Sequence, residues 1–189
     1  RAPRPGRVRP RAATTLGAHR AAEIHAGLLD RAPELAQRRG FARRYLFCAA
    51  ADEQEYFIAR LLGDDWRVVV QTGDNLGERM FNAFATVLAE ADAAVLIGSD
   101  IADGTTNDLH RAREILARET RAAVLGPVAD GGYWLLGLRQ MRIDYFADIE
   151  WGTTNVAAST VVSLQRGGLD VHHLAERHDI AVADDIDRV

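Results

Sequence analysis

The sequence LGPVADGGYWLLG, residues 125–137, decides the fold more than any other stretch of the chain. Apolar runs at residues 122–125 and 133–138 flank Asp130 and two glycines, which predicts two strands with an acid between them. Glycine lets a ligand come close to main-chain N–H groups. Because no helix fits between the two runs, we expect part of the sheet to be antiparallel or mixed.

A second acid follows a second apolar run. Residues 93–98 are apolar throughout, as expected of a strand with both faces covered, and Ser99 and Asp100 come directly after them. Ligands of open α/β sheets bind at the carboxyl ends of strands. Acids at two such places suggest a site for a metal ion and a phosphate-bearing ligand.

Along the rest of the chain, apolar runs alternate with segments of helical periodicity, which predicts an α/β protein. We expect one domain over residues 1–189, a three-layer sandwich around a mostly parallel, mixed sheet whose first strand would precede Arg1. Thr14 or Thr15 is expected to cap the first helix and Gly40 to end it. The predicted strands are 45–50, 67–71, 93–98, 122–125, 133–138 and 169–173, and the predicted helices are 16–39, 55–62, 78–91, 107–118 and 154–165, with a last helical turn from residue 184.

The composition is that of an ordinary globular protein, with 48% hydrophobic and 26% charged residues and a net charge of −4. Nothing in this balance favours a nucleic-acid or membrane partner. Cys48 is the only cysteine, which excludes a disulfide framework and a cysteine metal cluster. With no apolar run of membrane-spanning length, we expect a cytoplasmic protein. The six histidines show no zinc-type spacing and none is given a role.

Arginines crowd the first eleven residues, among three prolines and a glycine that predict a loop there. Gly6 would let the backbone approach a phosphate, and Arg7, Arg9 and Arg11 suit bidentate contacts with it. The alternative is a solvated basic end of the chain. The residues alone leave both interpretations open.

Five blocks of the sequence, in the same order, resemble bacterial DUF2064 proteins, candidate glycosyltransferases with the nucleotide-diphospho-sugar transferase (GT-A-like) fold. The Pro-Gly loop resembles that family's Pro-x-Pro-Gly-x-x-Lys-Thr-Arg-Leu, and Gly98-Ser99-Asp100 its Gly-Ser-Asp. The other blocks resemble Gly-x-x-Leu-Gly-Glu-Arg-Met, Leu-Gly-Pro-x-x-Asp-Gly-Gly-Tyr and Phe-x-x-Ile-x-Trp-Gly-Thr. They stand here at residues 73–80, 125–133 and 146–153.

The resemblance implies a nucleotide-sugar donor, a small-molecule acceptor and Mg²⁺ or Mn²⁺ as cofactor. Such a cation binds one or two carboxylates together with phosphate oxygens, and it neutralises charge on the departing nucleoside diphosphate. The implied roles are nucleotide binding by Gly6, Arg7, Arg9, Arg11 and Ser99, metal binding by Asp100, catalysis by Asp130, and substrate binding by Gly131, Gly132, Tyr133, Trp151 and Thr153.

Structural explanations compete with these roles. Asp100 would also serve as a helix cap after a strand, and Asp103, before a Gly-Thr-Thr turn, is interpreted as structural. Asp130 would also suit a tight Asp-Gly turn between strands. Trp151 would also suit the core.

Two other functions stay open. A nucleotidyltransferase, like the guanylyltransferases of cofactor synthesis, would use the arginine loop to bind a triphosphate and join it to a phosphorylated small acid. A non-catalytic family member would explain why the family's Lys-Thr-Arg-Leu stands here as Arg9-Pro10-Arg11-Ala12. It would also explain Ile101-Ala102 after the Ser-Asp pair and Ala181 in place of a C-terminal acid.

Overall fold

A computed structural model describes residues 1–36, 40–61 and 66–178. The chain forms two compact units. Unit 1 comprises Arg1–Gln71, Ser99–Gly104 and, of the described residues, His178; unit 2 comprises Thr72–Gly98 and Thr105–Arg177. The expectation of a single domain stays a prediction. Within the described ranges, no helix is both long enough and apolar enough to cross a membrane.

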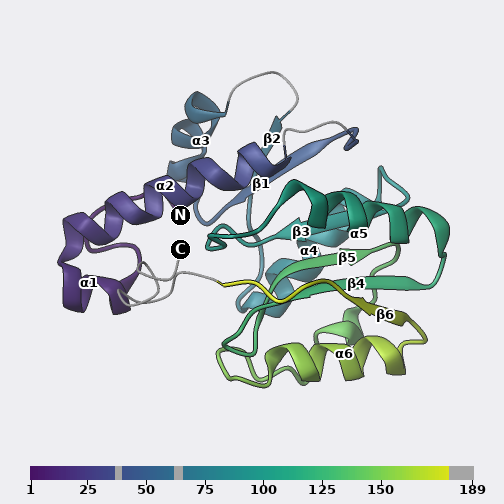
Figure 1. Ribbon diagram of the computed structural model, residues 1–189. Helices are drawn as coiled ribbons and strands as arrows, with labels where there is room; N and C mark the ends of the chain where they lie inside the picture. Colours follow the sequence, from purple (N-terminus) through teal and green to yellow (C-terminus); the bar gives the residue numbers. More distant parts are fainter. Residues whose placement is uncertain (37–39, 62–65, 179–189) are drawn as a thin grey trace. The chain divides into compact units, whose positions relative to one another are not determined.

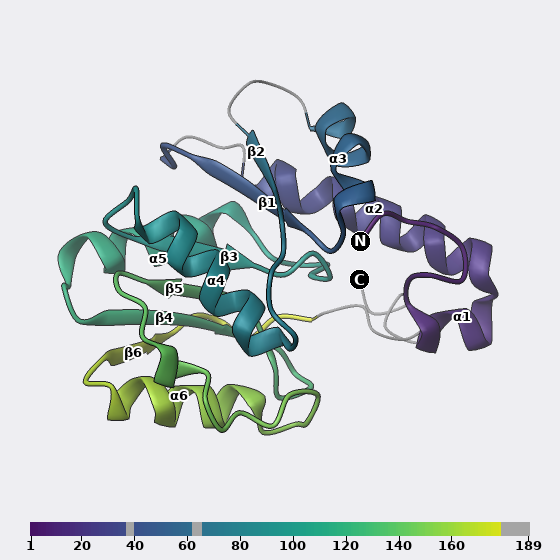
Figure 2. The ribbon, with the colours of Figure 1, turned by 180° about the vertical axis from the view of Figure 1, so that it is seen from behind.

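Unit 1 is built on a pair of parallel strands, β1 (Arg44–Cys48) and β2 (Trp66–Val70), which lie side by side (Figure 2). The helices are α1 (Pro10–Leu16), α2 (Ala18–Ala36) and α3 (Gln54–Arg60), and the 3-10 turn η1 (Ala51–Glu53) leads into α3. Leu29 of α2, Cys48 and Phe57 of α3 form a buried cluster. Cys48 is therefore a small core residue, as its apolar surroundings in the sequence indicate.

The N-terminal helix differs from the prediction. The structure adds a short helix, α1, before the predicted start at residue 16, and separates it from α2 at Gly17, whose φ of +81° no L side chain adopts easily. Thr14 does not cap a helix, because its hydroxyl donates to the carbonyl of Pro10 inside α1. The loop prediction was also wrong for its last residues: proline fits the first helical position, so Pro10 begins α1 and Arg11 lies within it.

Unit 2 contains a four-stranded mixed sheet in the order β3-β5-β4-β6. The strands are β3 (Ala94–Ile97), β4 (Ala122–Pro127), β5 (Tyr133–Leu138) and β6 (Asp170–His173). β5 runs antiparallel to β3 and β4, whereas β4 and β6 are parallel. This confirms the antiparallel pairing expected from the missing helix between residues 125 and 133. Among all described strands, parallel and antiparallel pairings are equally frequent.

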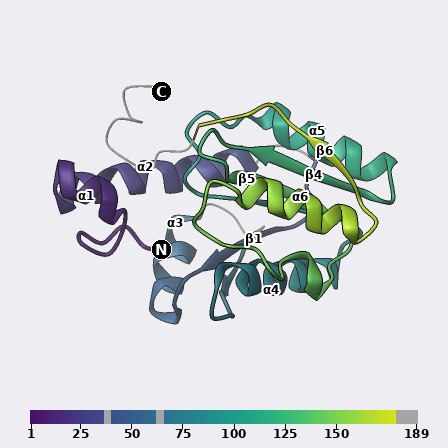
Figure 3. The same cartoon turned by 90° about the horizontal axis from the view of Figure 1, so that it is seen from below.

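Helices cover both faces of the unit 2 sheet (Figures 1 and 3). They are α4 (Leu76–Leu88), α5 (Thr106–Arg118) and α6 (Val156–Arg166), with the 3-10 turn η2 (Ile143–Tyr145) before α6. Leu136 and Leu138 pack with side chains of α4 and α6, and the intervening Gly137 faces Leu116 of α5. This alternation along β5 is the period of two that a strand imposes on its side chains. The α/β class with a mixed sheet is confirmed.

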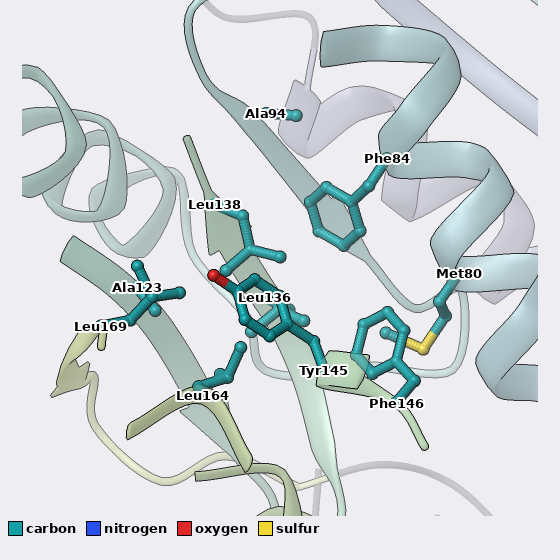
Figure 4. Close-up of a cluster of buried hydrophobic side chains, with 10 residues drawn as sticks. All are labelled: Met80, Phe84, Ala94, Ala123, Leu136, Leu138, Tyr145, Phe146, Leu164 and Leu169. Carbon is teal, nitrogen blue, oxygen red and sulfur yellow. The ribbon is translucent and has the colours of Figure 1, made fainter. Parts of the chain in front are cut away.

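The main core of unit 2 gathers aromatic and aliphatic side chains from helices and strands (Figure 4). Phe84 of α4 and Tyr145 of η2 lie in the same cluster as Leu138 and are almost completely buried. The Tyr145 hydroxyl accepts a hydrogen bond from Gln140, so the buried phenol is satisfied. This core supports the loops at the ends of the strands. The predicted last helical turn lies outside the described residues.

Candidate functional site

The arginine loop of unit 1 encloses one side of a hollow of about 460 Å³. The remaining wall comes from α2 and from the segment that follows β3 in the chain. Four arginines and one carboxylate line it, so the predicted loop and the predicted Ser-Asp pair meet in space. The lining residues are Arg1, Arg7, Val8, Arg9, Pro10, Arg11, His25, Ser99 and Asp100.

Local backbone geometry shapes the loop. Gly6 has a φ of +76°, and an added Cβ there would meet no atom within 4 Å. The main chain of Arg9 also adopts the left-handed conformation, with φ 46° and ψ 59°, although Arg9 is not a glycine. The conformation costs about 1–2 kcal/mol for such a residue. It lets the Arg9 carbonyl accept the first hydrogen bond of α1, from Ala13 at 2.9 Å.

Arg9 forms an ion pair with Asp100. Its Nη2 donates to Oδ1 of Asp100 at 2.7 Å, and the Ser99 hydroxyl lies 3.3 Å from the same oxygen. The Arg9 side chain is only 6% exposed, whereas that of Asp100 is 57% exposed. A buried guanidinium is therefore held against a carboxylate that solvent and ligands can reach.

His25 of α2 is a pocket residue that the sequence analysis missed. It is 6% exposed, and its Nε2 lies 3.0 Å from the Arg1 carbonyl. Because a carbonyl only accepts, Nε2 carries the proton and Nδ1 is an acceptor, for which the described part of the chain provides no partner. Burial lowers the pKa of His25, which favours the neutral ring. The sequence signal that could have predicted its burial is its helical spacing from Ala21 and Leu28, which are also buried on α2.

The donors in unit 1 suit a hard cation that also binds phosphate. Across the described ranges, no group of three or more His, Cys, Asp or Glu side chains could hold a metal ion by itself. Asp103 is engaged with His178, accepting from its main-chain N–H at 2.9 Å, which agrees with the structural interpretation. Asp100 alone fits Mg²⁺ or Mn²⁺ only if phosphate oxygens and waters complete the coordination. The residues present fit such an ion and do not fit a structural zinc site.

Asp130 lies in unit 2, on the turn between β4 and β5. Its Oδ1 accepts from the Gly132 N–H at 2.9 Å, and the carboxylate is exposed. Gly131 has a φ of +88°, and a Cβ added to it would lie 1.9 Å from the Thr154 carbonyl oxygen. The Gly131 carbonyl in turn accepts from Ala157 at 2.9 Å. The glycine turn is thereby packed against the start of α6, with Asp130 at its tip.

The other predicted substrate residues of unit 2 have contacts within the unit. The Tyr133 hydroxyl lies 3.7 Å from the sulfur of Met80, and burial raises the pKa of this phenol. Trp151 packs edge-to-face on Phe146, with ring centroids 6.0 Å apart. The Thr153 hydroxyl donates to the Glu150 carbonyl at 2.9 Å.

The predicted residues thus fall into two groups. Arg7, Arg9, Arg11, Ser99 and Asp100 line one hollow in unit 1, with Gly6 in the same loop. The second group belongs to unit 2 and comprises Asp130, Gly131, Gly132, Tyr133, Trp151 and Thr153. Ala181 and its neighbours lie outside the described residues.

Comparisons with known proteins show the family and the fold. The family "Uncharacterized protein conserved in bacteria (DUF2064)" matches residues 33–153. A candidate nucleotide-diphospho-sugar transferase from Desulfovibrio desulfuricans G20 is 32% identical and superposes with a TM-score of 0.86, over 98% of this chain and 81% of that one. No curated protein sequence matches the chain.

Two structures of Rv0371c from Mycobacterium tuberculosis H37Rv share the fold. One is 18% identical, with a TM-score of 0.59 over 100% of this chain and 92% of that one. The other, a manganese complex, is 19% identical, with a TM-score of 0.58 over 97% of this chain and 92% of that one.

Proposed function

The chain belongs to the DUF2064 family, and we propose that it is a metal-dependent glycosyltransferase that moves a sugar from a nucleotide-diphospho-sugar to a small-molecule acceptor. The observation that carries the proposal is the hollow that four arginines and the carboxylate of Asp100 line together. The 32% identical relative, a candidate nucleotide-diphospho-sugar transferase, supports the same reaction class.

The arginines would bind the diphosphate of the donor. Arg7 and Arg11 are exposed at the hollow, and their planar guanidinium groups match pairs of phosphate oxygens. Gly6, with no atom near its missing Cβ, would let the diphosphate approach the main chain. Ser99 would contribute a hydroxyl beside the Asp100 carboxylate.

Asp100 would hold Mg²⁺ or Mn²⁺ together with the phosphates. A manganese complex of Rv0371c, which has the same fold, is consistent with this choice of ion. When bound, the ion would stabilise the negative charge that the departing nucleoside diphosphate acquires. The chain's own arginines would share that task, because they act on the same phosphates.

We assign the sugar and its acceptor to unit 2 residues. Asp130 would contact the sugar or accept the acceptor's proton, a role that its exposed carboxylate permits. Gly131 and Gly132 would hold it at the tip of the turn, Gly131 by packing against Thr154 and Gly132 through its main-chain N–H. Trp151 and Thr153 would contribute from the loop before α6, and Tyr133 would support this surface from within.

A nucleotidyltransferase is the second candidate, since four arginines would also neutralise a triphosphate. The two reactions differ in the product released. We expect a nucleoside diphosphate from UDP-, GDP- or ADP-sugars in the presence of Mn²⁺, and no pyrophosphate from the corresponding triphosphates. Pyrophosphate from a triphosphate and a phosphorylated small acid would instead establish the second candidate. If neither product forms, the non-catalytic alternative becomes the better explanation.

A further inference from the structure

The Arg9–Asp100 ion pair occupies both groups that the proposed reaction needs. Arg9 Nη2 and Asp100 Oδ1 are 2.7 Å apart, and this oxygen also lies within reach of the Ser99 hydroxyl. A cation at Asp100 would lie next to the Arg9 charge, and like charges at that distance repel strongly where solvent is partly excluded. A phosphate would likewise have to compete with Asp100 for Nη2.

Arg9 is fixed in this position from two directions. Its side chain is 94% buried, and its main chain adopts a left-handed conformation at the start of α1. Non-glycine residues in such conformations persist only where the surroundings enforce them, and they cluster at ligand sites. Asp100, by contrast, is more than half exposed, so the carboxylate is the partner that is free to change its contacts.

Arg7 and Arg11 line the same hollow but differ from Arg9 in this respect. Both are exposed, and in the part of the chain that the structure describes neither forms an ion pair with a carboxylate. They are available to phosphate from the outset. Arg9 alone among these three is bound to the carboxylate expected to hold the metal.

We infer that Arg9 couples phosphate binding to metal binding by exchanging partners: the diphosphate replaces Asp100 on the guanidinium, and the displaced carboxylate then accepts the cation. This inference rests on the proposed function, because it presupposes a metal-bound diphosphate. Each ligand alone is bound weakly, and each strengthens the other. Premature binding of the cation without a donor is thereby limited by the chain itself.

The test measures each ligand without the other. Calorimetry gives the dissociation constant of Mn²⁺ alone and, in EDTA, that of inorganic pyrophosphate alone, for the wild type and for variants. Arg9→Gln should bind Mn²⁺ at least about tenfold more tightly, because the neighbouring positive charge is gone. Asp100→Asn should bind pyrophosphate about tenfold more tightly, because Arg9 is released to it.

Matched variants separate exchange from a general change of charge. Arg11→Gln removes a charge from the same hollow and should weaken pyrophosphate binding while changing Mn²⁺ binding less than about threefold, since exposed charges are screened. Asp52→Asn removes a carboxylate that pairs with Arg4 in unit 1 and should leave both constants unchanged. Arg9→Lys keeps the charge and should keep Mn²⁺ binding weak.

The double variant Arg9→Gln/Asp100→Asn decides the question. Exchange predicts that the gain in pyrophosphate affinity from Asp100→Asn disappears when Arg9 is absent. If that gain persists, or if neither single variant gains affinity, the inference is overturned. If the wild type binds neither probe, even when Mn²⁺ and pyrophosphate are supplied together, the proposed function fails and this inference with it. If Arg9→Gln does not fold, Arg9→Met replaces it in the same experiments, because a buried position tolerates an apolar side chain.

Discussion

Replacing Gly131 by alanine should destabilise the protein far more than the same change at Gly152, although both glycines have nearly the same left-handed φ of +88° and +83°. The added Cβ at residue 131 would lie 1.9 Å from the Thr154 carbonyl oxygen, whereas at residue 152 it would meet nothing within 4 Å. Both variants therefore carry the same backbone strain, of about 1 kcal/mol. Only the first carries a clash.

The size of the clash follows from the geometry. Because Cβ atoms essentially never come closer than 3.0 Å to another heavy atom, the turn or the Thr154 carbonyl must move by about 1 Å. That movement would break the hydrogen bond from Ala157 to the Gly131 carbonyl, worth about 1 kcal/mol, and disturb the start of α6. We expect Gly131→Ala to lower the free energy of unfolding by about 3 kcal/mol.

Urea unfolding followed by circular dichroism measures both variants under the same conditions. The informative quantity is the difference between the two losses, since the shared strain cancels. A Gly131→Ala variant no less stable than Gly152→Ala would refute the close packing of the glycine turn on the 151–155 segment.

Two further predictions concern pH. Burial opposes ionisation of Asp108, but hydrogen bonds from Arg177 and Thr105 outweigh this effect and lower the pKa of the carboxyl. The ionised carboxylate therefore stabilises the fold above the unfolded pKa of about 3.9, and this stabilisation is lost as pH falls through the folded pKa. Asp108→Asn should therefore cost most stability near pH 7 and progressively less below about pH 4 in urea titrations; a pH-independent loss would contradict this. Burial lowers the pKa of His25, so the unfolded chain binds a proton first and wild-type stability should fall as pH drops below about 6.5. His25→Phe should flatten that part of the profile, and an unchanged slope would exclude His25 as its source.

The sequence predicted the elements of unit 2 well because their signals are local. Strand β5 lies where its apolar run was found, and α5 begins one residue before the predicted start because Thr105 and Asp108 form a capping box. The antiparallel turn around Asp130 followed from the absence of room for a helix. In these segments, propensity, pattern and turn residues all favour the same structure.

The sequence was less informative where the structure depends on long-range contacts or on backbone exceptions. Gly17 separates α1 from α2 through a positive φ that helical periodicity does not reveal. Arg9, the residue before α1, has a left-handed conformation that is rare for its residue type. Its pairing with Asp100 spans 91 positions, and no local rule connects them. His25 lies on the apolar face of its helix, and a residue on such a face is first interpreted as part of the core.

The most direct test of the central claim is thermal unfolding of the wild type and Asp100→Asn with UDP-, GDP- and ADP-sugars, each in Mn²⁺ and in EDTA. Our account predicts that at least one diphospho-sugar stabilises the wild type in Mn²⁺ but not in EDTA, by about 2.7 kcal/mol at a hundredfold excess over its dissociation constant. It predicts that in Asp100→Asn any stabilisation by a diphospho-sugar is the same in Mn²⁺ and in EDTA, because the carboxylate that would hold the metal is gone. No stabilisation by any of these sugars, or an equal dependence on Mn²⁺ in the wild type and in Asp100→Asn, would contradict a metal-dependent sugar-nucleotide site at Asp100.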